Sequence, residues 1–277
     1  MCKRSNPTDP LVRRFLQTYN LNLLPLPRPV ARPGELYVKT AGKVKATPGR
    51  IDALIEPEVD LPEPYSEQLP DLSGVVSETV EVDFGLGLLA NFLAVLGIAP
   101  GIIDKVKLGY RDKRSAQLAF QFANVERDSI DPFTIGSTLI GHRFKDHPWV
   151  RPGNEYYVAA AFVRSRSIVV HAKDSSSAAV DLGAGLLSAF DGDASVTAQR
   201  AGGGAIAYHG QRSLAIGVEL YSLEYDEQAG SFLMGGQKRP VALLRGRERE
   251  LTPAFPAEHD EALLEIGELE QAGAAAG

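Results

Sequence analysis

Residues 82–98, VDFGLGLLANFLAVLGI, carry the periods of a strand and of a helix at the same time. Every even-numbered position is apolar, whereas the odd-numbered positions mix leucine and valine with Asp83, Asn91 and three glycines. This two-residue period extends past the roughly 9–11 residues that a strand needs to cross a bilayer. The segment also has an apolar stripe at helical spacing, formed by Leu88, Leu89, Phe92, Leu93 and Leu96. Because a spacing of four residues satisfies both periods, we predict a segment that is a helix in one state and a strand in another.

Residues 180–190, VDLGAGLLSAF, repeat this ambiguity. The apolar residues Leu182, Leu186 and Phe190 are four residues apart, and they also lie on the even-numbered face with Val180 and Ala184. Apolar and polar residues also alternate over 116–122 and over 194–199. A strand with one apolar and one polar face is typical of a barrel wall between lipid and water.

Two ordinary interpretations of the first segment stay open. Residues 84–103 are uncharged and long enough for a transmembrane helix, but Asn91, Pro100 and four glycines are unfavourable for one. A buried helix that packs by its apolar stripe is the commonest fate of such a segment. Taken alone, the segment favours a helix in a protein core, and a membrane role needs support from other features.

The rest of the chain indicates an α+β fold with a mostly antiparallel sheet, since the regular strand–helix alternation of a parallel sheet is missing. The stretches with strand character are 35–39, 43–46, 51–55, 154–172 and 213–225. Residues 56–73 resemble a proline-rich acidic loop, and 130–152 a loop with a short helix. Thr8-Asp9-Pro10 predicts the start of an amphipathic helix that runs to Tyr19, with a basic face.

The two ends of the chain differ in charge. Residues 1–50 contain ten Lys and Arg against two acidic residues, whereas 248–277 contain eight acidic residues against one arginine. Such ends can attract each other, or the basic end can attract an anionic membrane surface. The overall net charge of −6 is mild and by itself argues neither for nor against nucleic acid. We expect no nucleic-acid partner.

Cys2 is the only cysteine, which excludes a domain held by intramolecular disulfides. No apolar signal segment follows Met1, so we expect a protein that stays in the cytoplasm when inactive. Lys3 and Arg4 favour the Cys2 thiolate, and reaction with an acyl donor would place a lipid beside a basic segment. An incidental cysteine is the alternative.

We predict that the chain is not an enzyme and needs no cofactor or metal, because the common catalytic motifs are missing. His142 and His147 are five residues apart, the wrong spacing for two ligands on one helical face. Gly202-Gly203-Gly204 lacks the strand–loop–helix setting of a phosphate-binding loop and is interpreted as a turn.

Cys2, the stretch DPLVRRFLQTYNLNLLPLPRP (9–29) and PGELYV (33–38) resemble the bacterial gasdermins. The resemblance covers essentially the whole chain and implies a twisted, mostly antiparallel sheet with surrounding helices. It implies a pore-forming domain over 1–237 and a protease-sensitive linker with an autoinhibitory peptide over 238–277. It also implies palmitoylation of Cys2, cutting by a caspase-like or trypsin-like protease, and assembly into a very large β-barrel pore in the inner membrane. The expected outcome is death of the infected cell as an antiviral defence.

In this mechanism the segments 78–126 and 156–208 would each refold into an amphipathic hairpin, and the partners would be membrane lipids and further copies of the chain. The candidate membrane-facing positions are Leu86, Leu88, Phe92, Leu96, Leu118, Phe120, Leu182 and Leu186. The candidate headgroup contacts are Arg13, Arg14, Lys39, Lys43 and Lys45. The candidate cleavage region contains Arg245, Arg247 and Arg249, and the tail would mask a surface with Leu263, Leu264, Ile266 and Leu269. The main alternative is a soluble, autoinhibited scaffold or regulatory protein that never enters a membrane.

Overall fold

The computed structural model describes residues 19–40, 43–77, 82–112, 117–151, 154–174, 176, 178–180, 187, 196–226 and 231–234. The helices are α2 (Val82–Val95), α3 (Pro100–Asp112) and α4 (Pro132–Leu139), with 3-10 turns η1 (Ile51–Leu54) and η3 (Gly202–Gly204). The strands are β1 (Asn22–Arg28), β2 (Glu35–Thr40), β3 (Lys43–Arg50), β4 (Ile55–Glu56), β5 (Tyr65–Leu69), β6 (Leu72–Ser77), β7 (Gln117–Ala123), β8 (Val125–Ser129), β9 (Arg143–Phe144), β10 (Glu155–Lys173), β11 (Val196–Arg200), β12 (Ile206–Asp226) and β13 (Ser231–Met234).

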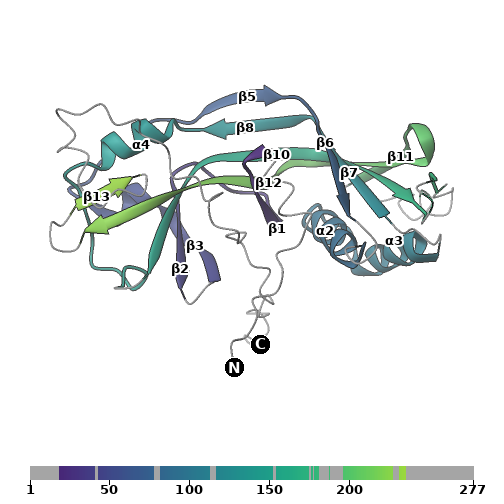
Figure 1. Ribbon diagram of the computed structural model, residues 1–277, viewed down its shortest axis with the longest axis horizontal. Coiled ribbons are helices and arrows are strands. Elements are labelled where there is room, and N and C mark those ends of the chain that lie inside the picture. The colour runs from purple at the N-terminus through teal and green to yellow at the C-terminus, as the bar shows by residue number, and fades with distance from the viewer. Residues whose placement is uncertain are drawn as a thin grey trace.

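Two long antiparallel strands, β10 with 19 residues and β12 with 21, form the axis of the molecule (Figure 1). The edge of β10 that faces away from β12 pairs with β2, then β8, then β7 along its length. A further strand lies outside each of these, because β3 pairs with β2, β5 with β8 and β6 with β7. The edge of β12 that faces away from β10 pairs with β13, β1 and β11. All of these pairings are antiparallel, which confirms the predicted mostly antiparallel sheet.

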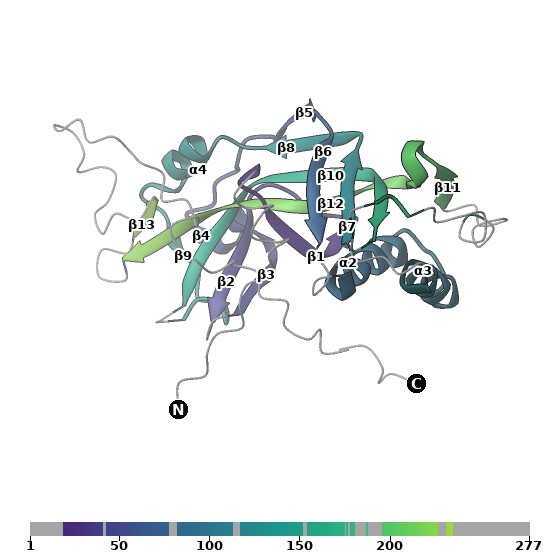
Figure 2. The same ribbon diagram turned by 45° about the vertical axis from the view of Figure 1, so that its right-hand side comes forward.

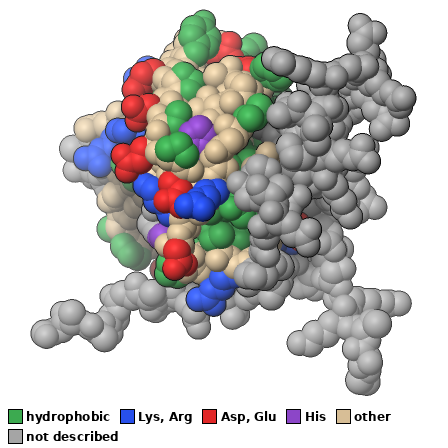
Figure 3. All heavy atoms as spheres, turned by 90° about the vertical axis from the view of Figure 1, so that its left-hand side faces the viewer, with side chains coloured by type: hydrophobic (Ala, Val, Ile, Leu, Met, Phe, Trp, Pro, Cys, Tyr) green, Lys and Arg blue, Asp and Glu red, His purple; other side chains and the backbone are tan. Residues whose placement is uncertain are grey.

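The helices lie at opposite ends of this sheet (Figures 1 and 2). Helices α2 and α3 cover the end built from β7 and the adjoining parts of β10 and β12, and their side chains join the largest apolar cluster. Helix α4 covers the other end, where Ile135 and Leu139 join a second cluster. Charged side chains of both signs are interleaved with scattered hydrophobic ones on the surface at that second end (Figure 3).

Two of the local predictions differ from the structure. The strand predicted over 51–55 is the turn η1 followed by β4, and its buried residues Ile51 and Leu54 are three apart. A three-residue period places both side chains on one face of a 3-10 turn. The loop predicted over 56–73 contains β5 and the start of β6. The apolar alternation that marks a strand is missing from β5, because polar side chains lie along both of its faces.

Three other local predictions agree with the structure. The strands predicted over 154–172 and 213–225 are parts of β10 and β12, and the short helix expected within 130–152 is α4. The side chain of Asp131 accepts a hydrogen bond from the backbone N–H of Thr134, and Pro132 begins the helix, which is a common N-terminal arrangement. Among the described helices, none reaches the length and hydropathy needed to span a bilayer.

Candidate membrane-inserting segments

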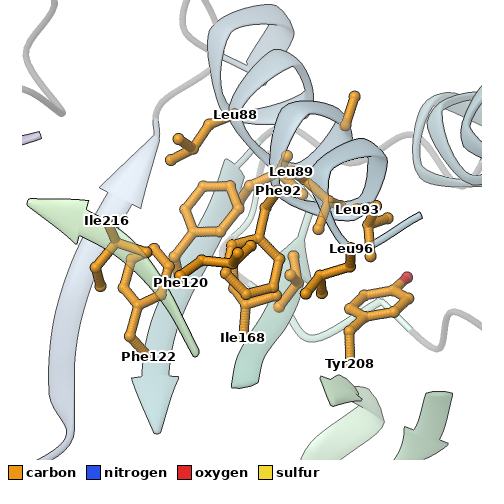
Figure 4. Close-up of a cluster of buried hydrophobic side chains, with 14 of the residues drawn as sticks. Leu88, Leu89, Phe92, Leu93, Leu96, Phe120, Phe122, Ile168, Tyr208 and Ile216 are labelled. Atoms are coloured by element: carbon orange, nitrogen blue, oxygen red, sulfur yellow. The ribbon is translucent and has the colours of Figure 1, made fainter. Parts of the chain in front are cut away.

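Within residues 82–98, which carry both periods, Val82–Val95 form α2 in this structure, and the helical stripe decides how this segment is buried. Leu88, Leu89, Phe92, Leu93 and Leu96 point from α2 toward the sheet, where they meet side chains of β7, β10 and β12 (Figure 4). The ring of Phe92 lies 6.3 Å from that of Phe122 on β7, at an interplanar angle of 58°. The resting chain therefore buries the apolar stripe against the sheet instead of exposing it.

A glycine on β12 lets the end of α2 approach the sheet closely. A Cβ atom built on Gly210 would lie 2.5 Å from a methyl carbon of Leu96, well inside van der Waals contact. Leu96 therefore occupies space that any other residue at position 210 would fill. This notch couples α2, in the first predicted hairpin, to β12.

Gly210→Ala is expected to lower the free energy of unfolding by about 1–3 kcal/mol, because the added methyl group overpacks the contact with Leu96. For a chain of this size that corresponds to a fall in Tm of roughly 2–10 °C, measured by thermal unfolding. Gly202→Ala is the matched control, since a Cβ at Gly202 meets nothing within 4 Å. Equal Tm values for the two variants would mean that Leu96 can leave the notch without cost.

Helix α3 is attached to the same strand by a polar contact inside the core. The hydroxyls of Tyr110 on α3 and Tyr208 on β12 lie 3.2 Å apart, and both side chains are completely buried. Each hydroxyl is thereby satisfied away from water, which removes the cost of burying it alone. Both helices of the first predicted hairpin are thus held on β12.

Strand β7 shows the alternation that the sequence predicts for this part of the first hairpin. Leu118, Phe120 and Phe122 are buried beneath α2, and the residues between them are partly exposed. The pairing of β7 with β10 brings Phe122 opposite Ile168 and Leu118 opposite Ala172. One face of β7 is therefore wholly apolar, and α2 covers it.

The structure gathers the described candidate membrane-facing residues in one place. All of them are buried in the largest apolar cluster: Leu86, Leu88, Phe92, Leu96, Leu118 and Phe120. Lys39 lies on β2, where its Nζ is 3.5 Å from a carboxylate oxygen of Glu155. Lys43 and Lys45 belong to β3. The remaining candidates lie outside the described residues: Cys2, Arg13, Arg14, Leu182, Leu186, Arg245, Arg247, Arg249, Leu263, Leu264, Ile266 and Leu269.

A charged ladder, which no sequence pattern predicted, crosses the sheet beside these segments. Arg127 on β8 donates two hydrogen bonds to Glu219 on β12, at 2.8 and 2.9 Å, and a third to Glu67 on β5 at 2.9 Å. The hydrogen bonds to Glu219 are the largest cause that raises the pKa of Arg127 above its ordinary value. Strand β10 lies between β8 and β12, and its Ala161 is paired with both Ser129 and Glu219. The small side chain of Ala161 allows the guanidinium of Arg127 to cross β10 to Glu219. Charges so far apart in sequence give no local signal.

A second polar chain crosses the sheet at Ser167 and His209. The Ser167 hydroxyl is 2.7 Å from Nδ1 of His209 and accepts a hydrogen bond from the Asn124 side chain at 3.3 Å. Ser167 is only 1% exposed and lies within β10, so this polar chain joins the β7–β8 junction to β10 and β12. Among the described residues, no three His, Cys, Asp or Glu side chains are grouped closely enough to hold a metal ion.

Comparison with known proteins gives consistent similarities. The chain is 25% identical over 228 residues to the gasdermin bGSDM of Vitiosangium sp. (strain GDMCC 1.1324), covering 78% of this chain and 81% of that protein. It is 23% identical over 221 residues to the gasdermin bGSDM of Lysobacter enzymogenes, covering 76% and 79%. The structure of a bacterial gasdermin from Bradyrhizobium tropiciagri has a similar fold, with a TM-score of 0.57 at 16% identity, covering 81% of this chain and 90% of that one. The sequence model of the Bacterial Gasdermin Family matches residues 24–231, most of the chain, and the chain therefore belongs to this family.

Proposed function

We propose that this chain is a latent pore-forming protein that is activated by proteolysis. Removal of residues 238–277 by a caspase-like or trypsin-like protease, at or near Arg245, Arg247 or Arg249, frees the domain over 1–237. A fatty-acyl group on Cys2 and the basic N-terminal residues hold this domain at the inner membrane. Many copies then assemble into a large β-barrel pore that kills the cell during viral infection. Membership of the bacterial gasdermin family supports a pore-forming protein, and not an enzyme.

The observation that carries this proposal is the burial of α2. Its sequence has an uninterrupted apolar face at strand spacing, yet the chain folds it as a helix against β7 and β12. If α2 and α3 leave the sheet, the apolar faces of α2 and β7 lose their cover and become able to face lipid. In a bilayer every backbone polar group must be paired, so the released hairpins can be stable only in a closed barrel of many copies.

The tail is expected to control this transition. A protein that ends at residue 237 should release dye from vesicles of anionic lipid, whereas the full chain should release little. We expect the rates of dye release to differ by about tenfold or more, because the tail would keep the pore-competent state of the full chain below about one tenth of the population. Addition of a trypsin-like protease to the full chain should reproduce the effect of truncation. A truncated protein that is folded yet leaves the vesicles intact would instead favour the soluble scaffold.

A further inference from the structure

The two edges of the sheet differ within the described residues. On the β10 side the outermost strands β3, β5 and β6 each pair with one inner neighbour, and no described strand covers their outer edges. Strand β5 has no proline, although Pro64 and Pro70 flank it, so its backbone N–H groups are intact. Tyr65 at its start is 68% exposed. Open edges of this kind are templates for pairing with another chain.

On the other side the edge of β12 is occupied along most of its length. Strand β13 pairs with residues 223–226, β1 with residues between Ala215 and Val218, and β11 with 206–210. Strand β1, which pairs with the middle of this edge, contains Pro25 and Pro27, and its pairing with β12 is interrupted by a register shift. Because proline cannot donate a backbone hydrogen bond, β1 holds this edge less firmly than a regular strand would.

Strand β13 is fixed to β12 by an aromatic wedge. The ring of Phe232 lies 4.5 Å from Phe144, edge to face, and 5.1 Å from Tyr225. Phe144 in turn lies 5.1 Å from Tyr156 of β10. Phe232 is buried, and its ring lies against side chains of β9 and β12. This four-residue strand is therefore held by one side chain more than by its short backbone ladder.

Strand directions show which edge a second copy can use without changing the pattern of the sheet. The row β5–β8–β10–β12 contains four strands of alternating direction, so β5 runs opposite to β12. If β5 of one copy pairs with β12 of the next, the antiparallel alternation continues through the contact. If it pairs with β13 instead, the contact is parallel, because β13 runs antiparallel to β12 and therefore in the same direction as β5. Single-chain bacterial barrels have an even number of antiparallel strands.

We propose that a second copy of this chain docks its β5 edge on the β12 edge of the first, and that β13 blocks this contact at rest. Release of β13 frees residues 223–226, a stretch about as long as the five-residue β5 strand of the next copy. The weakly paired β1 is then displaced as the contact extends along β12. The contact is heterologous, so one copy offers each edge and the row grows head to tail. This inference rests on the proposed pore-forming function and names the surface through which the copies join.

The first test changes Phe232 in the full chain. Oligomers formed in detergent micelles are measured by chemical cross-linking. Phe232→Ala is expected to raise the yield of cross-linked oligomers about tenfold or more, because loss of a buried phenyl ring weakens the hold on β13. Phe232→Leu keeps an apolar side chain and should give a smaller increase. Phe133→Ala is the matched control, since Phe133 is 67% exposed on α4. An unchanged yield for Phe232→Ala would overturn the blocking role of β13.

A disulfide between β12 and β13 separates release from simple misfolding. Asp226 and Ser231 are paired across the two strands, so cysteines there, with Cys2 replaced by serine, can lock β13 in place. In the Phe232→Ala background the oxidised protein should remain monomeric and the reduced protein should oligomerise. Oxidised copies added to reduced ones should stop growth, since they offer a β5 edge but no β12 edge. Equal oligomer formation by the oxidised and the reduced protein would contradict the proposal.

A photo-crosslinking benzophenone amino acid in place of Tyr65 identifies the partner surface. In oligomers of the Phe232→Ala protein it should attach to residues 206–226 of another copy, and the same probe at Phe133 should not. Cross-linking of the probe to β5 of another copy, or no cross-link to another copy, would reject this contact. Dye release by the same proteins keeps the two proposals apart: leakage without the β5–β12 cross-link overturns only the contact, and no leakage from any released form overturns the pore.

Discussion

Ala94→Arg is expected to abolish dye release by the activated protein while leaving the resting fold intact. Ala94 lies on the exposed side of α2 and arginine is a good helix former, so the helix tolerates the change. In the strand form position 94 belongs to the even-numbered apolar face that would meet lipid. An arginine near the middle of a bilayer costs about 2–4 kcal/mol in each copy, which is roughly 30-fold to 1000-fold in an insertion equilibrium.

Gly87→Arg is the matched control for this substitution. Gly87 and Ala94 are two helical turns apart and share the outward side of α2, but an odd separation places them on opposite faces of a strand. A Cβ at Gly87 meets nothing within 4 Å, so the resting helix can also carry this arginine. The control should therefore release dye at close to the normal rate, because position 87 would face water in the barrel.

Both proteins are best compared as truncated forms that end at residue 237, with thermal unfolding of the full chains as the check on folding. Loss of leakage in Ala94→Arg alone would support a strand over 82–98 in the pore. Equal leakage by both variants would show that α2 does not become a membrane strand, and equal loss would point to a helix that lies on the membrane by its outward side.

Phe92→Ala is expected to lower the free energy of unfolding of the full chain by about 3–5 kcal/mol. Phe92 is 1% exposed and packs against Phe122 on β7, so its loss leaves a cavity between α2 and the sheet. Alanine keeps the strand face apolar and leaves no cavity in fluid lipid, so the change weakens the resting state more than the inserted one. Leakage by the full chain, without proteolysis, should rise.

Phe133→Ala is the control for the loss of a phenyl ring. Its side chain is exposed, and a change there is expected to alter the free energy of unfolding by about 0.5 kcal/mol or less. Thermal unfolding measures both effects, and dye release from vesicles measures the consequence. A destabilised Phe92→Ala protein that stays as inert as the control would show that the docking of α2 does not limit activation.

Much of the sheet could be predicted because its strands carry local signals. The long apolar runs of β10 and β12 and the alternation of β7 each identify a strand without help from tertiary structure. Strand β5 could not be found in this way. Its residues are mostly polar on both faces, and Ser66, Glu67 and Gln68 bond to partners on β8 that lie about sixty positions away in sequence.

The charged ladder has the same explanation. Arg127 meets Glu67 and Glu219 only because β5, β8, β10 and β12 lie side by side, and no spacing in the sequence relates these three residues. The aromatic wedge at Phe232 and the notch at Gly210 likewise join distant segments. Such contacts depend on the order of strands in the sheet, which the pattern of each strand alone does not specify.

Residues 82–98 separate what the sequence alone determined from what the tertiary structure decided. The sequence determined that the segment is apolar at both helical and strand spacing, because a repeat of four residues satisfies both periods. It could not choose between them, since burial of the apolar face is favourable in either form. The tertiary structure decided in favour of the helix. With Gly210 leaving room for Leu96, and with the apolar face of β7 below, the stripe of α2 packs against the sheet and is removed from water.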